Sequence, residues 1–545
     1  MEEKQILLTP ELSYRLGAID VGSNSIRLII AEPLRDGSYR ILDEEKAPAR
    51  LGKGLSTTGT LSRDGVQQAL EALRRMKQIA IGYQVRELSV IATCAVREAT
   101  DGPAFVARVK AELDLDIEVI SAEREAHLAF TSVARSFQLE GKNVAVADTG
   151  GGSTEIILAS GNVVEAICGT PLGAVRVTEL FGANQPMSNE QLEKMLDYID
   201  RELRRSTRSA LLEPHVLIGS GGTFTTLAEM VMANKGQAGL PVRGCEVYRA
   251  DVRHMLDKLR KLPVEARANL PGLSPDRTDI IVAGVAIIDR LMRHFELNRV
   301  TIHDRGVRDG LLLQMIDRQN GTSGDKAIDR DAAIDRFAST CGVDLVHVRH
   351  VAKLAGEIYA GLAGPLGLDL KDRALLEAAA RLQDVGYLIN YEQHHKHSYY
   401  LILNSRLPGF QPQELELIAN LARYHRGSGP KKKHDNFRQL GTRDQQRVRQ
   451  LTAILRVAGG LDRTNTQAVR SVTVDTKERE VTILVQADSD PEVDIWTATA
   501  RAEHMIKAFE LEKLDIHWRR THGSNGNGSV PGLVRTTQRQ PAEER

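Results

Sequence analysis

One strand–turn–strand motif occurs twice in this chain, and the repeat limits the folds that the chain can adopt. The second copy, residues 143–159 (NVAVADTGGGSTEIILA), is an apolar run that ends on an aspartate, three glycines and Ser-Thr-Glu before a further apolar run. The first copy, residues 14–32, has the same layout. Three positions correspond between the copies: Asp20 with Asp148, Gly22 with Gly150, and Ser25 with Ser153. Such self-similarity predicts two similar lobes that face each other across a cleft, each with one turn.

The residues of these turns are suited to binding phosphate together with a metal ion. Glycine allows a backbone to fold back tightly, and the successive N–H groups of such a turn can form a concave anion-binding site. Asp148 places a carboxylate beside the same turn, which makes chemical sense if a cation lies between it and a bound anion. A plain glycine hairpin is the alternative for the GGG sequence alone. The second copy of the motif favours the phosphate-plus-metal interpretation.

Composition restricts the class of protein further. The 545 residues are enough for about three or four domains. Lys plus Arg and Asp plus Glu are 72 each, so the overall charge does not predict a polyanion-binding surface. The four cysteines include no CxxC pair, which favours reduced thiols over a cysteine-ligated metal. The first residues lack the pattern of a signal peptide, and no apolar run approaches the roughly 20 residues of a membrane span. We therefore expect a cytoplasmic protein with no membrane association.

Strands and helices alternate through the first part of the chain, which predicts an α/β fold. The order β-β-β-α-β-α-β-α is expected over the first lobe and again over the second, giving mixed, mainly parallel sheets with helices on their faces. Strands are expected at 15–20, 26–32, 40–45, 87–93, 117–120, 144–147, 154–158, 163–167, 216–219 and 299–303. Helices are expected at 62–82, after 101–103, and at 122–136, 188–209 and 307–318. The apolar residues 280–288 fit a buried helix or strand.

Three polar stretches fall at the carboxyl ends of expected strands, where ligands bind in such sheets. Arg97 in TCAVREA follows one strand and can clamp a phosphate with two parallel hydrogen bonds. GSGGT, with Ser220, Gly221 and Thr223, is a glycine turn that opens a helix, and a helix N-terminus favours anions. HDRGVRDG, residues 303–310, carries two arginines and an aspartate into another helix. Each is a common surface feature alone, but their joint position at strand ends predicts one site.

At this point the chain resembles the exopolyphosphatase and guanosine-pentaphosphate phosphohydrolase (Ppx/GppA) phosphatases. The matching stretches are AIDVGSNSIRLII (18–30), IATCAVREA (91–99), VISAEREAHLAF (119–130), ADTGGGSTEI (147–156), IGSGGT (218–223), LPGLSPDR (270–277), IHDRGVRDGLL (302–312), NSRLPGF (404–410) and ARYHR (422–426). The resemblance covers roughly residues 14–520. It implies duplicated actin-like (ribonuclease H-like) lobes around a cleft, and metal-dependent hydrolysis of a terminal phosphoanhydride.

The resemblance also implies a catalytic base. The family's glutamate corresponds to Glu125, which would activate the attacking water, and a positioned carboxylate is a suitable proton acceptor. This sequence departs from the family pattern at two positions, with Ala122 for a glycine and Arg124 for a glutamate. Without the resemblance, Glu125 is an acid in the first turn of a helix, where it complements the helix dipole. Glu123 is the competing assignment for the base.

We expect the site to combine backbone amides, Arg97 and carboxylates around the terminal phosphate. Mg²⁺ is the expected cofactor, with a monovalent cation such as K⁺ as a second candidate, and positioning with charge neutralisation is what phosphoryl transfer needs. The expected metal ligands are Asp148, Glu155 and Asp20. The expected phosphate-binding residues are Gly22, Ser23, Asn24, Ser25, Gly150, Gly151, Gly152, Ser153, Thr154, Ser220, Gly221 and Thr223.

The chain becomes mainly helical after a linker at residues 320–325 (NGTSGD). Its histidines and acids are similar in order to those of HD phosphohydrolase domains: His350, Asp384, one of His394, His395 and His397, then His425 and Asp462. Gln383 stands where that family has its paired histidine, which favours a degenerate, inactive HD-like domain. A retained weak metal site at Asp384, His425 and Asp462 is the alternative.

These patterns give a division into five segments, with an alternating stretch at 471–485 that resembles a small antiparallel sheet, a helix near 498–509, and a Gly/Ser/Asn/Pro-rich end. The expected segments are residues 1–137 for the first actin-like lobe, 138–319 for the second, 326–468 for the helical HD-like domain, 469–520 for a small α+β domain, and 521–545 for a disordered tail.

A local basic stretch lies between residues 423 and 449. Lysine runs such as Lys431, Lys432 and Lys433 are usually solvated loops, but with Arg426 they are also candidates for guiding a long polyanion, an attraction that salt would weaken. Nucleic acid is a disfavoured partner because no aromatic interleaving or nucleic-acid-binding motif accompanies the charge.

The sequence leaves the function open between two classes. An enzyme would be an exopolyphosphatase that processively removes terminal phosphate from inorganic polyphosphate, with a pppGpp 5′-phosphohydrolase as its close alternative. A non-catalytic sensor of polyphosphate or (p)ppGpp is the other class, with Arg124 disabling the chemistry. The basic C-terminal half favours long polyphosphate. The resemblance further implies a homodimer.

Overall fold

The two copies of the motif form matching parts of two sheets in a computed structural model of the chain. The structure describes residues 14–34, 37–210, 212–320, 329–405, 407 and 409–520, and the backbone of strand 535–538. β1 (Leu16–Val21) pairs antiparallel with β2 (Ile26–Pro33) and parallel with β4 (Glu87–Ala92). β6 (Asn143–Thr149) pairs in the same way with β7 (Thr154–Ser160) and β9 (Val216–Ser220). The predicted duplication is confirmed at the level of strand pairing.

Each sheet is extended by further strands. The first has the order β3-β2-β1-β4-β5, with β3 at Tyr39–Ala47 and β5 at Ile117–Val119. The second has the order β10-β11-β9-β6-β7-β8, with β8 at Val163–Thr170, β10 at Glu246–Tyr248 and β11 at Arg299–Ile302. Every strand expected in the two lobes is present, and β10 is an additional edge strand.

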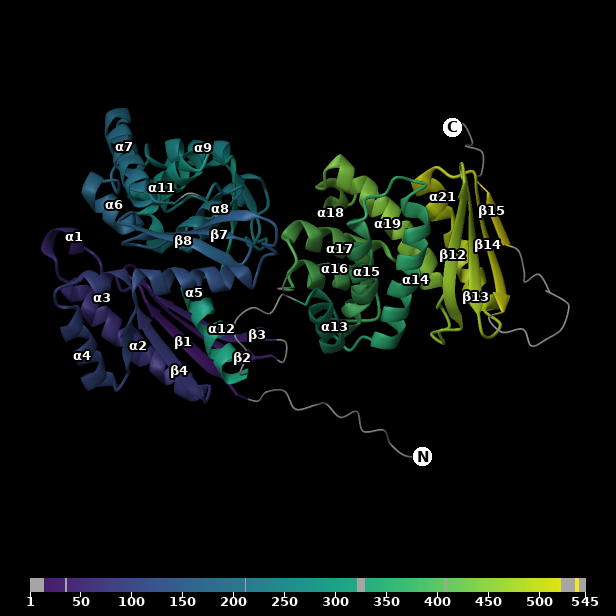
Figure 1. Cartoon of the computed structure of the whole chain (residues 1–545), viewed down its shortest axis with the longest axis horizontal. Helices are drawn as coiled ribbons and strands as arrows, with labels where there is room; N and C mark the ends of the chain where they lie inside the picture. Colours follow the sequence, from purple (N-terminus) through teal and green to yellow (C-terminus); the bar gives the residue numbers. More distant parts are fainter. Residues whose placement is uncertain are drawn as a thin grey trace. The chain divides into compact units, whose positions relative to one another are not determined.

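The helices of this unit cover the two sheets (Figure 1). Their bounds are α1 Leu55–Thr58, α2 Arg63–Gly82, α3 Cys94–Glu98, α4 Gly102–Leu113, α5 Ala122–Ala134, α6 Ala174–Phe181, α7 Asn189–Ser206, α8 Gly222–Asn234, α9 Arg249–Leu259, α10 Val264–Arg267, the 3₁₀ helix η1 Pro275–Arg277, α11 Ile281–His294 and α12 Val307–Asn320. The expected cap of α2 is confirmed, because the Ser62 side chain accepts a hydrogen bond from the Gly65 amide. The apolar run near residue 280 lies in α11, which is buried almost throughout.

Two helices lie between the sheets and join the lobes. Leu128 and Ala129 of α5 pack with Leu16 of the first sheet, whereas Ala126 and Phe130 on the other side of α5 pack with the second sheet. α12 follows the last strand of the second sheet but packs in the first lobe's core. Its apolar residues pack on β1 and β2, so residues 307–319 belong structurally to the first lobe. The sequence order had suggested the second lobe for them.

The chain divides into two compact units, Met1–Ile328 and Asp329–Arg545. The second unit contains α13 Arg330–Thr340, α14 Leu345–Ala363, α15 Asp372–Leu382, the 3₁₀ helix η2 Val385–Leu388, α16 His394–Leu403, α17 Pro412–Tyr424, α18 Asp435–Arg438, α19 Thr442–Gly460, α20 Glu492–Arg501 and α21 Glu503–Phe509. Its strands are β12 Val469–Lys477, β13 Glu480–Ala487, β14 Lys513–Arg520 and β15 Arg535–Gln538.

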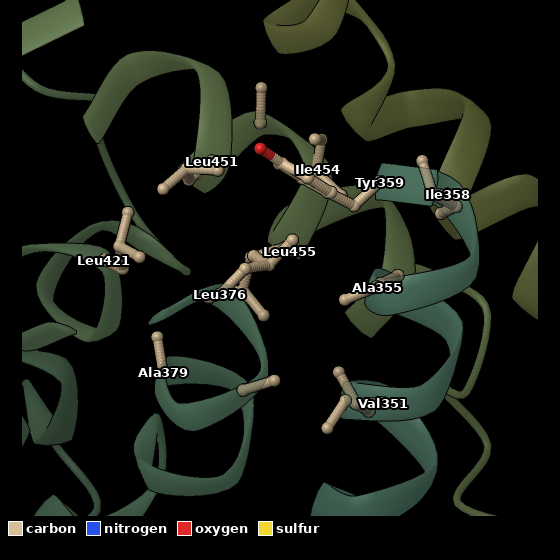
Figure 2. Packing of buried hydrophobic residues seen from close by; sticks show 14 of the residues in the cluster. Val351, Ala355, Ile358, Tyr359, Leu376, Ala379, Leu421, Leu451, Ile454 and Leu455 are labelled. Carbon is tan, nitrogen blue, oxygen red and sulfur yellow. The ribbon is translucent and has the colours of Figure 1, made fainter. Parts of the chain in front are cut away.

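The helices and the sheet of this second unit share one hydrophobic core. Figure 2 shows Val351 and Ala355 of α14 facing Leu376 of α15, with Leu455 of α19 beside them. The same cluster continues into Ile483 of the sheet. Residues 326–468 and 469–520 therefore do not form separate cores, because the apolar face of the sheet is buried on the helices.

The four-stranded sheet differs from the expected small antiparallel one. β12 and β13 form the predicted antiparallel hairpin, but β13 pairs with β14 in parallel. β15 then pairs antiparallel with β14, so the prediction of a disordered tail over 521–545 is wrong for Arg535–Gln538. The stretch RTTQ contains β-branched threonines and occupies the edge of β14, which otherwise lacks a neighbour on that side. The rest of the predicted tail lies outside the described residues.

In the part of the chain that the structure describes, no helix is long and apolar enough to cross a membrane.

Candidate functional site

A polar cavity of about 150 Å³ lies in the first unit, where the turns of the two repeats meet. Its lining includes the turns at residues 22–25 and 150–153, which join β1 to β2 and β6 to β7. In both turns the first glycine amide donates to the serine carbonyl three residues on, at 3.2 Å for Gly22 and 2.9 Å for Gly150. Those two amides are used within the turn, so the amides that can bind an anion must belong to the other turn residues.

The glycines of the second turn are required by close packing between the lobes. A Cβ on Gly152 would lie 2.4 Å from the Cys94 sulfur, and one on Gly151 would lie 3.1 Å from the Ser23 Cβ. Gly173, which sequence reasoning did not single out, packs directly against this turn. A Cβ added at Gly173 would lie 2.2 Å from the Gly151 carbonyl oxygen. A side chain at Gly151 or Gly152 would push the two lobes apart, and one at Gly173 would displace the second turn.

Buried carboxylates gather at this cavity. Glu125 is 8% exposed, Asp148 is 9% exposed, and Asp20 also lines the cavity. Glu155 is 2% exposed and lies behind the lining, directly opposite Asp148 in the register of β6 and β7. Burial, together with the nearby Asp20 carboxylate, raises the pKa of Asp148 to about 6. Burial also raises the pKa of Asp20 and of Glu155. Such a group of buried acids favours a bound cation.

The donor set fits a hard divalent cation. Among the described residues, Asp20 Oδ1 and Glu155 Oε1 are buried without a hydrogen-bond partner, and all the candidate ligand atoms are oxygens. The oxygens of Asp20, Asp148 and Glu155 do not meet the spacing of a closed three-ligand cluster, however. Mg²⁺ bound by one or two carboxylates, with water and substrate phosphate completing the octahedron, matches that arrangement better than an all-protein cage.

Glu125 lies in the first turn of α5 and points into the cavity. The Ser121 side chain caps this helix by accepting from the Arg124 amide at 3.1 Å. Glu125 Oε2 lies 3.0 Å from an Arg97 nitrogen, and the same nitrogen donates to the Ile120 carbonyl at 2.8 Å. Burial raises the pKa of Glu125 to about 7, with Arg97 opposing the rise. A carboxyl group with this pKa is suited to general-base catalysis near neutral pH.

The two residues next to Glu125 point elsewhere. Glu123 and Arg124 are exposed, and neither lines the cavity. Arg124 forms an ion pair with Glu118 at 2.8 Å, so its partner in the structure is not Glu125. Of the two glutamates that the sequence left as candidates, Glu125 is the one placed among the other site residues.

Several predicted site residues lie behind the cavity lining. They are Arg97, Thr154, Glu155, Ser220 and Thr223. The Thr154 hydroxyl donates to the Leu172 carbonyl at 2.5 Å, and the Ser220 hydroxyl donates to the Arg305 carbonyl at 2.9 Å. These contacts shape the turns, and they leave the hydroxyl protons of Thr154 and Ser220 unavailable to a phosphate. The other predicted phosphate-binding residues, from Gly22 to Ser25, from Gly150 to Ser153, and Gly221, line the cavity.

Four arginines line the cavity: Arg27, Arg277, Arg305 and Arg308. Sequence reasoning placed Arg305 and Arg308 of HDRGVRDG at the site without a role, and it did not single out Arg27 or Arg277. Arg27 lies opposite Asp20 in the register of β1 and β2, the position that Glu155 holds in the other repeat. Burial lowers the pKa of Arg277 to about 10, which leaves it charged at neutral pH. These arginines lie in the stretches SNSIR, SPDR and HDRGVRDG. The sequence does not show that the three stretches meet, because only the tertiary fold brings them together.

The basic residues of the second unit are on its surface. Lys431, Lys432 and Lys433 are exposed, and exposed Arg426 lies over the Tyr391 ring at 5.7 Å. Their role in guiding a polyanion stays a prediction.

Comparison with known proteins now decides the family. The family model described as "Ppx/GppA phosphatase family" matches residues 30–319, and the model "Ppx/GppA phosphatase, domain III" matches residues 330–513. The chain belongs to the Ppx/GppA phosphatase family. It is 27% identical over 419 residues to a guanosine-5′-triphosphate,3′-diphosphate pyrophosphatase of Vibrio parahaemolyticus, covering 75% of this chain and 80% of that protein. It is 28% identical over 312 residues to exopolyphosphatase 1 of Mycobacterium bovis, covering 57% of this chain and 90% of the relative.

A solved structure supports the same assignment. The crystal structure of an exopolyphosphatase from Cytophaga hutchinsonii aligns with a TM-score of 0.53 at 27% identity, covering 57% of this chain and all of that one. The duplicated actin-like fold that the sequence implied is therefore shown for this Ppx/GppA family member. Both kinds of phosphatase occur among its relatives, and the identities are too similar to choose between them.

Proposed function

We propose that the protein is an Mg²⁺-dependent exopolyphosphatase that hydrolyses the terminal phosphoanhydride bond of inorganic polyphosphate. The observation that carries the proposal is the cavity itself, where two phosphate-type turns, buried carboxylates and four arginines converge around Glu125. Phosphoryl transfer needs positioning and charge neutralisation above all, and this set of residues supplies both.

The roles follow from position and charge. The terminal phosphate lies against the turns at 22–25 and 150–153, where free amides and the arginines that line the cavity neutralise its oxygens. Glu125 accepts a proton from water as the water oxygen bonds to the terminal phosphorus. The bond from that phosphorus to the bridging oxygen breaks, which releases orthophosphate and a chain shorter by one residue. Mg²⁺, when bound near Asp148 and Asp20, supplies further neutralisation of the developing charge.

Arg97 has a positioning role in this proposal. It does not line the cavity, and its 3.0 Å contact holds the Glu125 carboxylate in place. We therefore assign Arg97 to positioning Glu125 and no longer to binding phosphate. The arginines that bind phosphate in this proposal are Arg27, Arg277, Arg305 and Arg308.

Polyphosphate is the favoured substrate because the cavity offers no platform for a base. None of the residues that line it is aromatic, and apart from glycines its lining is almost entirely polar or charged. Guanine recognition ordinarily uses stacking and contacts to the base edge. The pppGpp 5′-phosphohydrolase is kept as the second candidate because the Vibrio pyrophosphatase matches across both units of this chain.

Phosphate release by the full chain with Mg²⁺ tests the proposal. Long-chain polyphosphate, tripolyphosphate and pppGpp are compared by kcat/KM at one ionic strength. The proposal expects the largest value for long-chain polyphosphate. A larger value for pppGpp would establish the second candidate. Binding of every substrate without phosphate release would instead indicate a non-catalytic sensor.

A further inference from the structure

A second group of ligand-type side chains belongs to the unit formed by residues 329–545, whereas the cavity described above belongs to the other unit. Asp384 follows α15, His394 begins α16, and His425 follows α17. One ligand atom from each of the three lies within 4.8 Å of the others. Three separate helices thus bring two imidazoles and a carboxylate to one point, and no other set of His, Cys, Asp and Glu in the described residues does so.

The distances between these atoms suit a shared metal better than hydrogen bonds. Asp384 Oδ1 lies 3.4 Å from His394 Nε2 and 3.6 Å from His425 Nε2. Hydrogen bonds of this kind are about 2.7–3.2 Å long. Ligand atoms that are each about 2.1 Å from a tetrahedral zinc ion are about 3.4 Å apart. The carboxylate is therefore spaced from both rings as a fellow ligand would be.

The other nitrogen of each ring fixes the tautomer that a metal requires. His394 Nδ1 lies 3.0 Å from the Tyr391 carbonyl oxygen, and His425 Nδ1 lies 2.7 Å from the Ala422 carbonyl oxygen. A carbonyl can only accept, so both Nδ1 atoms carry the proton and both Nε2 atoms present a lone pair. Metal-bound histidines typically have this arrangement, with the second ring nitrogen donating to a backbone carbonyl.

His394 Nε2 forms no hydrogen bond with any residue that the structure describes. His394 is 1% exposed, and its Nε2 is buried with no hydrogen-bond partner in the described part of the chain. A buried polar atom left unpaired costs free energy, and an ion at this point would remove the cost. A histidine that served only to fill the core would be expected to have both nitrogens satisfied.

This set differs from the one that the sequence suggested. Asp462 accepts from His347 Nδ1 at 2.8 Å and from the Gln467 amide at 2.9 Å, so it is already satisfied and lies outside the cluster. Gln383, at the position of the missing histidine, lines the cavity beside Asp384 and His425, but the three ligand atoms meet without it. The loss of that histidine consequently leaves the set of Asp384, His394 and His425 intact.

We propose that Asp384, His394 and His425 bind one divalent transition-metal ion of the Zn²⁺ or Fe²⁺ class. Two imidazoles and one carboxylate form a ligand set that these ions accept while keeping a coordination position open. Asp384 and His425 also line a cavity of about 500 Å³, so the open position faces that space. The lining of the same cavity includes three arginines and three aspartates, so a bound dication would make it net positive: Arg426, Arg463, Arg501, Asp344, Asp384 and Asp462. Water or a small oxyanion such as phosphate would complete the coordination.

Metal binding by the chelator-treated full chain tests this site independently of phosphatase activity. Zn²⁺ stoichiometry is measured by equilibrium dialysis, and Co²⁺ loading is followed by its visible absorption bands. The proposal expects His425→Gln and the nearly isosteric Asp384→Asn each to lose one Zn²⁺ equivalent and the cobalt bands. Asp148→Asn, in the first unit, is expected to keep that equivalent.

His395→Gln is the matched control, since His395 is next to His394 on the same helix but is not part of the cluster. It is expected to keep full binding. Circular dichroism and the melting temperature show whether each variant is folded. If the histidine variant does not fold, Asp384→Asn still tests the site. Equal stoichiometry in wild type, His425→Gln and Asp384→Asn would overturn the proposal, as would a wild-type chain that binds no Zn²⁺ in this unit.

Discussion

The guanidinium of Arg97 lies 3.0 Å from a carboxylate oxygen of Glu125, with side-chain exposures of 22% and 10%. The contact joins the helix after β4 to the first turn of α5 and holds the proposed base at the edge of the cavity. It also opposes the effect of burial on the pKa of Glu125. The protonation state of the base is therefore set by two competing influences that mutation can separate.

The first prediction concerns the pH dependence of activity. Burial raises the pKa of Glu125 to about 7, and a general base must be deprotonated, so kcat/KM is expected to rise with pH through an apparent pKa near that value. Arg97 lowers this pKa, so Arg97→Gln is expected to move the rising limb to higher pH. Arg124→Gln is the control, because Arg124 pairs with Glu118. A limb at the same pH in Arg97→Gln and wild type would contradict the assignment of Glu125.

The second prediction concerns stability without metal. The pKa values of Glu125 and Asp148 are raised in the folded state from 4.5 and 3.8 to about 7 and about 6. The folded state therefore binds protons more tightly than the unfolded state, and the stability that these groups contribute is lost as pH rises through about 6 to 7.

Melting temperature measured from pH 5 to pH 8 in chelator checks this sign. It is expected to fall with rising pH, to fall less steeply in Asp148→Asn, and to recover with Mg²⁺ more at pH 8 than at pH 6. If the melting temperature in chelator fell with pH equally steeply in wild type and Asp148→Asn, Asp148 would not be responsible for the pH dependence of stability.

The third prediction concerns Gly173, which packs against the second phosphate-type turn. A Cβ at this position would lie 2.2 Å from the Gly151 carbonyl oxygen, so Gly173→Ala must displace the turn. We expect kcat/KM to fall by about 10²-fold, the typical effect of a displacement of about 1 Å at an active site. Gly82→Ala is the control, because no atom lies within 4 Å of its added Cβ. Equal activity in both variants would show that the turn tolerates displacement.

The fourth prediction concerns the arginines that replace Arg97 as phosphate clamp. Arg277 lines the cavity and is 8% exposed, so Arg277→Gln removes a buried positive charge beside the proposed phosphate position. Kinetics are expected to show a loss of about 10² in kcat/KM. Arg293→Gln, whose side chain is 57% exposed on α11, is expected to retain wild-type kinetics. A loss of only a few-fold for Arg277 would remove it from the site.

Local patterns explain why most of the fold was predictable. The turns after β1 and β6 are encoded by adjacent glycines and an aspartate, and the Ser62 cap of α2 is encoded within four residues. The packing of α12 in the first lobe was not predictable, because α12 follows a strand of the second lobe and its apolar residues fit either core.

The site was predictable from local sequence where a single turn carries the residue, as for Asp148, whereas Glu125 was identified only through the family resemblance. It was not predictable where chemistry depends on partners far apart in sequence. Arg97 points to Glu125, 28 residues on, instead of into the cavity. In the second unit Asp462 pairs with His347, 115 residues away, and Asp384 Oδ1 lies 3.4 Å from His394 Nε2. No spacing rule gives these pairings, because they depend on how whole helices pack.

Phosphate release by Glu125→Gln is the most direct test of the central claim. The substitution keeps the size of the side chain and removes its ability to accept a proton. With Mg²⁺ and long-chain polyphosphate, we predict that kcat falls by about 10² to 10⁴ while polyphosphate binding is retained. The exposed neighbour variant Glu123→Gln is predicted to have wild-type kcat. Wild-type turnover in Glu125→Gln, or an equal loss in Glu123→Gln, would contradict the account.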